Sequence, residues 1–322
     1  MIPAHPMPIV HLAWISVAAL ALPAHAQDGT VFSAGVSLVH VDGEVVGQNG
    51  RNLAGLSKED FRVLDEGREQ AIVSFSSDEQ PLDVILLFDV SGSMIVQARG
   101  VASAARTGLN ELRKGDRVAV MVFNTRSRVV APFTEDLNAV ERSISEGVLG
   151  QRFGGGTYIQ QAADDAALLF LSQPRSNRRR AVLIITDNIG KRTRREQPII
   201  RDYWEADAVL SGLILPWRSY RTVHTIVMIV GPQNLLGERL TLAGMKGIAE
   251  KTGGDAIDSA DPGPAFEEMM HRLRTRYSLY YATPHGRPGV QRTLHLELSA
   301  AGAARFPQAR VRARHGYITP AQ

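Results

Sequence analysis

Residues Leu82–Met94 read LDVILLFDVSGSM, and this stretch decides how the chain folds. It opens with a continuous apolar run, Val84–Phe88, which is typical of a strand buried on both faces of a parallel sheet. Further apolar runs alternate with segments whose apolar residues recur at helical spacing, so we expect an α/β fold with a doubly wound, mostly parallel sheet. The predicted strands are Val84–Phe88, Val118–Phe123, Ala181–Ile185 and Val223–Val230.

The segments between these strands have apolar residues at spacings of three and four, which predicts helices packed on both faces of the sheet. One of them runs between two tryptophans, Trp204 and Trp217, and another ends at the helix-stop signal Gly253-Gly254. The predicted helices are Val101–Leu112, Leu137–Val148, Tyr158–Leu171, Tyr203–Leu213, Leu240–Lys251 and Phe266–Arg276.

Both flanks of this region have short alternating strands separated by turn signals such as Asp42-Gly43. Neither flank has enough strands to be stable alone, so we expect them to pair with each other into one small β unit. The predicted organisation is a signal peptide over 1–26, an N-terminal β segment over 27–81, the α/β domain over 82–276, and a C-terminal β segment over 277–322.

The first residues indicate export. Leu12–Leu22 is apolar apart from Ser16, and Ala24-His25-Ala26 follows as an A-x-A cleavage site, although the preceding residues contain no lysine or arginine. The run is shorter than the ~20 residues that span a bilayer, and no later run reaches that length. We therefore expect an exported protein, periplasmic or extracellular, with no transmembrane segment in its mature form. A buried N-terminal helix is the alternative.

Composition excludes several classes of site. The 322 residues include no cysteine, which rules out disulfides, cysteine-bound zinc and a thiol nucleophile. The formal net charge of +3 is too small to indicate a nucleic-acid partner by itself. Hydrophobic residues make up 44% of the chain, which is enough to bury a core, so wholesale disorder is not expected.

Oxygen-bearing side chains cluster where predicted strands end. Asp89, Ser91 and Ser93 directly follow the first buried strand, and Asp187 directly follows the third. Thr157 opens a predicted helix after three glycines, which let the backbone approach closely. Ligands bind at the carboxyl ends of strands in open α/β sheets, and hard oxygen donors suit Mg²⁺, Mn²⁺ or Ca²⁺. These five residues are therefore candidate metal ligands.

In order and context, these five residues resemble the metal-ion-dependent adhesion site (MIDAS) of von Willebrand factor type A (VWA) domains. That pattern has Asp-x-Ser-x-Ser, then a threonine, then an aspartate in a Thr-Asp-Gly or Ser-Asp-Gly turn. Here Asn188 stands where the family commonly has glycine, and asparagine tolerates the positive φ of such a turn. The flanks Leu53–Val63 and Val311–Tyr317 resemble bacterial secreted VWFA-related proteins, which implies the same architecture and location.

The resemblance implies cation-dependent adhesion to a protein partner. In the family the hydroxyls of Ser91, Ser93 and Thr157 would bind the ion directly, while one or both aspartates act through water. A partner's Asp or Glu then completes the coordination, so the reaction is binding. In integrin domains occupancy is linked to a shift of the last helix, which corresponds to Phe266–Arg276 here.

Two other functions remain open from the sequence: a metal-assisted hydrolase, and a scaffold whose metal only stabilises the fold. No Gly-x-Ser-x-Gly elbow surrounds Ser91, and no phosphate-binding Gly-rich motif follows a strand, so we predict that the chain is not an enzyme. The chain also has two basic runs. We expect Lys191–Arg195 at the rim of the site, where it steers acidic partners or is simply solvated, and Arg178–Arg180 in a solvated turn.

Overall fold

The computed structural model describes residues 38–77, 80–154, 156–191, 194–215, 240–242, 244–283 and 287–320. The predicted signal peptide over residues 1–26 and the strand predicted over Val223–Val230 lie outside these ranges. None of the helices within the described ranges is both long enough and apolar enough to cross a membrane.

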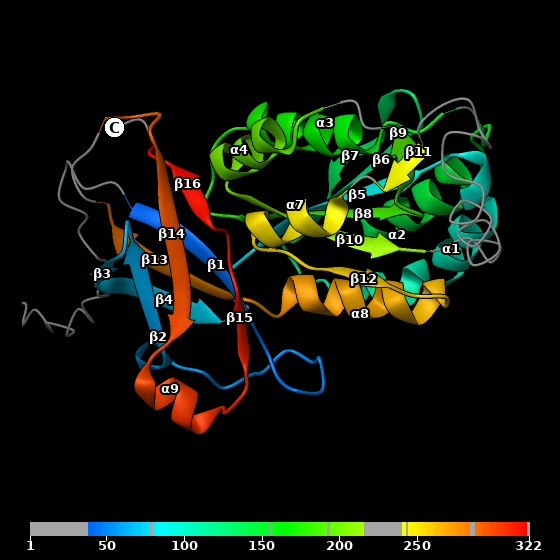
Figure 1. Cartoon of the computed structure of the whole chain (residues 1–322). Coiled ribbons are helices and arrows are strands. Elements are labelled where there is room, and N and C mark those ends of the chain that lie inside the picture. The colour runs from blue at the N-terminus through cyan, green and yellow to red at the C-terminus, as the bar shows by residue number, and fades with distance from the viewer. Residues whose placement is uncertain are drawn as a thin grey trace, which may run out of the picture. The chain divides into compact units, whose positions relative to one another are not determined.

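A six-stranded sheet forms the centre of the α/β part (Figure 1). Its strands are β5 (Leu82–Asp89), β6 (Arg117–Phe123), β7 (Ser127–Thr134), β8 (Arg179–Thr186), β10 (Ala208–Ile214) and β12 (Ala256–Asp258). Their order is β12-β10-β8-β5-β6-β7, and the pairs are parallel except for β6 with β7. The predicted α/β class with a mostly parallel sheet is therefore confirmed.

Helices cover both faces of this sheet, which explains the continuous apolar run in β5 (Figure 1). Val84, Leu86 and Phe88 pack into the core on one face, while Ile85 and Leu87 pack into the core on the other. The helices that cover the first core are α1 (Ile95–Leu109), α2 (Leu137–Arg142, continued by a π-helical turn over Ser143–Val148) and α8 (Pro262–Arg274). The helices that cover the second core are α3 (Ile159–Leu171), α4 (Glu196–Ala206) and α7 (Met245–Thr252).

One predicted helix is wrong. Tyr203–Leu213 divides between the end of α4 and strand β10, and the chain turns at Asp207, which has the left-handed φ of 51°. Every residue of β10 is buried between β8 and β12, so sheet pairing outweighs the helical spacing of its apolar residues. The helix predicted from Leu240 begins instead at Met245, because Leu240–Leu242 (β11) pairs with β9 (Ile189–Lys191).

The flanking segments pair with each other into two antiparallel sheets, so the β unit predicted from both termini is confirmed. Their orders are β15-β1-β13-β4 and β16-β14-β2-β3, so strands from the two flanks adjoin within each sheet. The strands are β1 (Leu38–Val46), β2 (Phe61–Asp65), β3 (Arg68–Gln70), β4 (Ile72–Ser77), β13 (Tyr277–Ala282), β14 (Gln291–Leu298), β15 (Arg310–Arg312) and β16 (Gly316–Ile318), with the short helix α9 (Ala300–Arg305) after β14.

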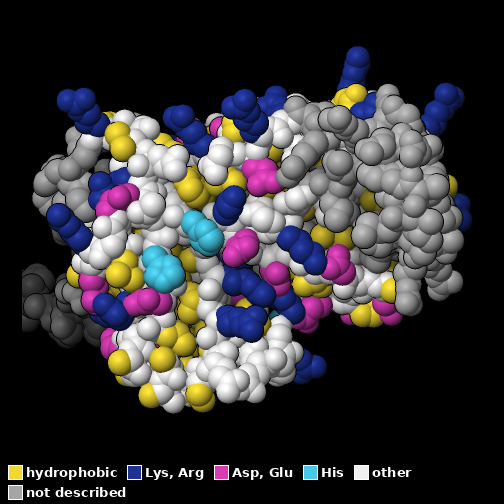
Figure 2. Space-filling model, in the orientation of Figure 1, with side chains coloured by type: hydrophobic (Ala, Val, Ile, Leu, Met, Phe, Trp, Pro, Cys, Tyr) yellow, Lys and Arg dark blue, Asp and Glu magenta, His cyan; other side chains and the backbone are white. Residues whose placement is uncertain are grey.

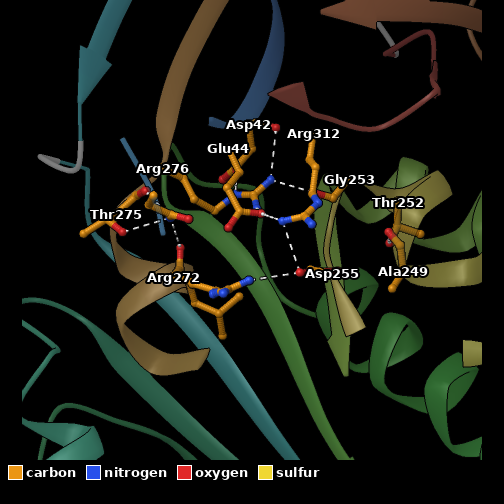
Figure 3. Close-up of polar contacts among 12 residues, drawn as sticks. Asp42, Glu44, Ala249, Thr252, Gly253, Asp255, Arg272, Thr275, Arg276 and Arg312 are labelled. Atoms are coloured by element: carbon orange, nitrogen blue, oxygen red, sulfur yellow. Dashed lines mark hydrogen bonds and ion pairs between the residues drawn. The ribbon is translucent and has the colours of Figure 1, made fainter. Parts of the chain in front are cut away.

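A buried arginine at the start of β8 ties this β unit to the α/β part. Arg179 is only 1% exposed, because its guanidinium donates to Asp42 in β1 and to two carbonyls at the end of α8. Arg276 binds the same carboxylate and, with Arg312, also faces Glu44 (Figure 3). The prediction of a solvated turn over Arg178–Arg180 is therefore wrong. Carboxylates and carbonyls brought from distant parts of the chain provide the acceptors that make this burial possible.

Candidate functional site

Three loops meet at the carboxyl ends of β5 and β8. One follows β5, one follows β8, and the third leads into α3. Two backbone hydrogen bonds join them: the N–H of Gly154 donates to the carbonyl of Val90 over 3.1 Å, and the N–H of Lys191 donates to the carbonyl of Thr157 over 3.0 Å. The loops predicted from the sequence to lie together therefore do so.

The loop after β5 holds Asp89 by both carboxylate oxygens. Its Oδ1 accepts from the N–H of Ser91 over 2.8 Å, and its Oδ2 accepts from the hydroxyl of Thr186 over 2.7 Å. Asp89 is 1% exposed, so these bonds fix its orientation in a buried place. Sequence reasoning assigned no role to Thr186, although its position as the last residue of a buried strand, next to Asp187, was a usable signal.

Hydroxyl contacts connect the first loop to the loop after β8. The Oγ atoms of Ser91 and Ser93 lie 3.2 Å apart, and the Ser93 hydroxyl donates to Asp187 Oδ2 over 2.6 Å. Asp187 Oδ1 accepts from the N–H of Ile189 over 2.9 Å. The intervening Asn188 has a φ of 60°, which confirms that asparagine takes the left-handed turn conformation here.

Thr157 is placed differently from the other four candidates. It is buried, and its backbone carbonyl binds the strand that follows Asp187. Among the described residues, its hydroxyl forms no hydrogen bond with Asp89, Ser91, Ser93 or Asp187. Side-chain contacts therefore connect Ser91, Ser93 and Asp187, and Asp89 joins them through the N–H of Ser91. Thr157 adjoins the loop after β8 through its backbone carbonyl.

Asp89 and Asp187 form a buried pair of like charges. Burial first, and then the charge of Asp187, raises the pKa of the Asp89 carboxyl to about 7. Burial also raises the pKa of Asp187, against the hydrogen bonds donated by Ser93 and Ile189. In the ionised state the two side chains place two negative charges in one desolvated position, which is costly unless a cation compensates them.

No arginine or lysine supplies that compensation within the described ranges, and this distinguishes the pair from the other buried carboxylates there. Each of the others has an arginine partner: Asp42 and Glu44 with Arg276, Asp60 with Arg305, Asp65 with Arg292, Asp83 with Arg117 and Arg178, Asp116 with Arg274, and Asp164 with Arg194.

The donor set fits a hard divalent cation. Two carboxylates and the neighbouring hydroxyls offer only oxygen, which Mg²⁺, Mn²⁺ and Ca²⁺ prefer. In the described part of the chain, no three histidine, aspartate or glutamate side chains come together in a way that could hold a metal ion. That finding does not conflict with the fit, because the cluster contains two carboxylates and its remaining donors are hydroxyls.

We expect the stability of the cation-free protein to fall as the pH rises from about 4 to 7. The folded state keeps a proton on Asp89 that the unfolded chain, with an ordinary pKa near ~3.9, releases earlier. This contribution to stability is fully present below the pKa of Asp89 in the unfolded chain. It is lost as the pH rises through the pKa of Asp89 in the folded protein. Urea unfolding in EDTA at a series of pH values measures it. Asp89→Asn should flatten the profile, and parallel profiles for the two proteins would contradict this assignment.

The basic residues after Asp187 are only partly available to attract an acidic partner at the rim of the site. Arg194 forms an ion pair with Asp164 in α3 and donates to Gln161 over 2.7 Å, so its charge is used within the molecule. Burial is the main cause that raises the pKa of Asp164 to about 6. Arg195 is exposed at the start of α4. Steering of acidic partners, one of the two roles considered for this run, therefore does not extend to Arg194.

Comparison with known proteins defines the class of the central domain. Residues 84–190 match the family model of the von Willebrand factor type A domain. The chain therefore contains a VWA domain, and the resemblance inferred from its motifs is confirmed. Domains of this family commonly bind proteins, are usually non-catalytic and often bind divalent cations. A search of curated protein sequences found no match.

Three bacterial proteins are among the solved structures that match this chain. An aerotolerance-related membrane protein from Bacteroides fragilis is 18% identical, with a TM-score of 0.45 over 60% of this chain and 98% of that one. BatB from Bacteroides thetaiotaomicron is 19% identical, with a TM-score of 0.43 over 60% and 97%. A von Willebrand factor type A protein from Catenulispora acidiphila is 14% identical, with a TM-score of 0.43 over 90% and 76%. Similarity at this level bears on neither activity nor partners.

Proposed function

We propose that the chain binds a protein partner through a divalent cation, Mg²⁺ or else Mn²⁺ or Ca²⁺. The proposed ligand set is Asp89, Ser91, Ser93, Thr157 and Asp187. The observation that supports it most is the buried Asp89–Asp187 pair, which has no cationic side chain beside it among the described residues. Buried charges in proteins are paired or coordinate metals, and within the described ranges neither carboxylate is paired with an arginine or lysine.

Each side chain has a role that follows from its contacts. Thr186 and the N–H of Ser91 orient Asp89, while the N–H of Ile189 orients Asp187. The serine and threonine hydroxyls add neutral oxygens, so the site does not exceed the charge of a divalent ion. A bound cation would offer an open coordination position to a carboxylate of the partner. We infer that the outcome is adhesion, that the chain is not an enzyme, and that it acts outside the cytoplasm.

Cation-dependent capture tests this proposal. The immobilised chain is incubated with envelope extract in Mg²⁺ and then eluted with EDTA, in parallel with Asp187→Asn and with Asp261→Asn. Asp261 is exposed and forms no side-chain hydrogen bond or ion pair among the described residues, so its variant makes the same charge change away from the cluster. We expect EDTA to release the same proteins from wild type and Asp261→Asn, and none from Asp187→Asn.

Two results would contradict the proposal in different ways. If Mg²⁺ raises the melting temperature but no protein is retained in a cation-dependent manner, the metal is a fold stabiliser and the scaffold alternative is correct. If Mg²⁺ instead supports turnover of phosphate or peptide substrates, and Asp187→Asn abolishes that turnover, the site belongs to a metal-assisted hydrolase.

A further inference from the structure

A cavity lies at the opposite end of the parallel strands from Asp89, between the α/β part and the β unit. Its volume is about 400 Å³, within the ~300–1,000 Å³ typical of ligand pockets. Lys246, Glu250 and Asp255 line it on the side of α7 and β12, and Leu294–Leu296 and Arg310–His315 line it on the side of the β unit. It shares no residue with the cluster of Asp89 and Asp187.

Charged side chains of both signs line this cavity: Lys246, Arg310, Arg312 and Arg314 are cationic, and Glu250 and Asp255 are acidic. Figure 2 shows histidine, arginine and lysine side chains gathered on this face of the molecule, with fewer acidic ones between them. Arg312 and Arg314 are already paired, with Asp255 at 3.1 Å and Asp207 at 2.8 Å, and Figure 3 shows the first of these contacts. Arg310 is exposed and forms no side-chain hydrogen bond or ion pair with any described residue. It is therefore the guanidinium at the cavity that is available to an external carboxylate.

One wall of the cavity is an open strand edge. β14 pairs with β16 only at Gln291–Thr293, and the N–H of Leu294 then donates to the carbonyl of His315 over 3.0 Å. Along an antiparallel strand, successive residues direct their N–H and C=O groups to opposite sides of the strand. The N–H and C=O of Leu296 therefore point to the same side as the N–H of Leu294, away from β2. No described strand pairs with β14 there, and β15 is likewise an edge strand.

The side chains at this edge alternate in character. Leu294 and Leu296 are buried, at 4% exposure each, and His295 between them is exposed. A strand added beside them would have the same period of two, with one set of side chains toward the apolar floor and the other toward the cationic rim. The chemistry of the cavity therefore corresponds to an extended segment in which apolar and acidic residues alternate.

We propose that this cavity binds an extended acidic segment of a partner protein. The segment adds as a strand to the edge of β14 at Leu296, its apolar side chains lie over Leu294 and Leu296, and its carboxylates face Arg310. Main-chain hydrogen bonds supply affinity in such strand addition, and the side chains supply specificity. This interaction requires no metal, so it is independent of the cation-dependent site.

Fluorescence anisotropy with a defined probe tests the proposal on the full chain. The probe is a labelled eight-residue peptide of alternating valine and glutamate, titrated in EDTA so that a cation-bound carboxylate cannot contribute. Two control peptides carry lysine in place of glutamate, or proline in place of a central valine, which removes one ladder N–H. The protein variants are Arg310→Glu and Arg68→Glu. Arg68 is an exposed arginine on β3, the opposite edge of the same sheet.

We expect the acidic peptide to bind in EDTA and neither control peptide to bind. Arg310→Glu should weaken binding about tenfold, since it replaces an attraction with a repulsion, and Arg68→Glu should leave it unchanged. No binding in EDTA, equal binding of the lysine or proline peptide, or equal losses in both arginine variants would each overturn the proposal. None of those results would bear on the proposed cation site, because the peptide titration is done in EDTA.

Discussion

Asp89→Ala is expected to abolish cation binding while the domain stays folded. It removes one of the two carboxylates at the site and also the acceptor that positions Thr186 and the N–H of Ser91. Loss of a residue that only orients metal ligands already costs about 10- to 100-fold in affinity, so we expect a loss of at least this size. Titration calorimetry with Mg²⁺ alone measures it, and cation-dependent partner capture should disappear with it.

Two comparisons keep that experiment decisive. Asp89→Asn retains the shape of the side chain, so it replaces the alanine variant if the latter proves poorly folded by circular dichroism. Asp261→Asn controls for a general change of charge. An Mg²⁺ affinity that is the same in Asp89→Asn as in Asp261→Asn and wild type would show that the cluster is not the cation site.

Arg179→Met should destabilise the fold far more than a substitution at an exposed arginine. The Arg179 guanidinium donates to Asp42 over 2.8 Å and to the carbonyls of Leu273 and Arg274 over 2.8 and 3.1 Å. The charges of Arg179 and Arg276 hold the pKa of Asp42 well below its usual range, despite burial that would raise it. Removing one partner of a buried ion pair costs about 3–5 kcal/mol, and methionine keeps most of the apolar stem.

Urea unfolding compares this variant with Arg175→Met, since Arg175 is exposed and forms no side-chain hydrogen bond or ion pair among the described residues. The control should unfold like wild type. Because Asp42 is the charged partner, the double variant Arg179→Met/Asp42→Asn should be less destabilised than the sum of the single variants. If Arg179→Met and Arg175→Met have the same stability, the β unit is not held by this contact.

The sequence predicted most strongly the features that depend on local patterns. The apolar run Val84–Phe88 indicated a strand covered on both faces, and β5 indeed divides its side chains between two cores. The carboxyl ends of parallel strands lie at one edge of a sheet, so the order of strands and loops along the chain was enough to place Asp89 near Asp187. The hydrogen bond from Ser93 to Asp187 is consistent with that placement.

Features that depend on distant partners could not be predicted in the same way. Arg179 follows another arginine in a basic run, which is typical of a solvated turn, and only the pairing of β1 with β13 brings Asp42 to it. Similarly, β10 has apolar residues at a spacing that fits a helix, and its neighbours β8 and β12 decide that it is a strand. The open edge of β14 is visible only once β15 is known to pair with β1.

The β unit also has a consequence for biosynthesis. Strands β1 to β4 leave the ribosome before β13 and β14 exist, and the hydrogen bond between Tyr281 and Asp65 joins positions 216 residues apart. Until the last part of the chain is made, the early strands have open edges that can pair wrongly. We therefore expect the VWA domain to fold first and the β unit to close last, with slow kinetics set by this long-range pairing.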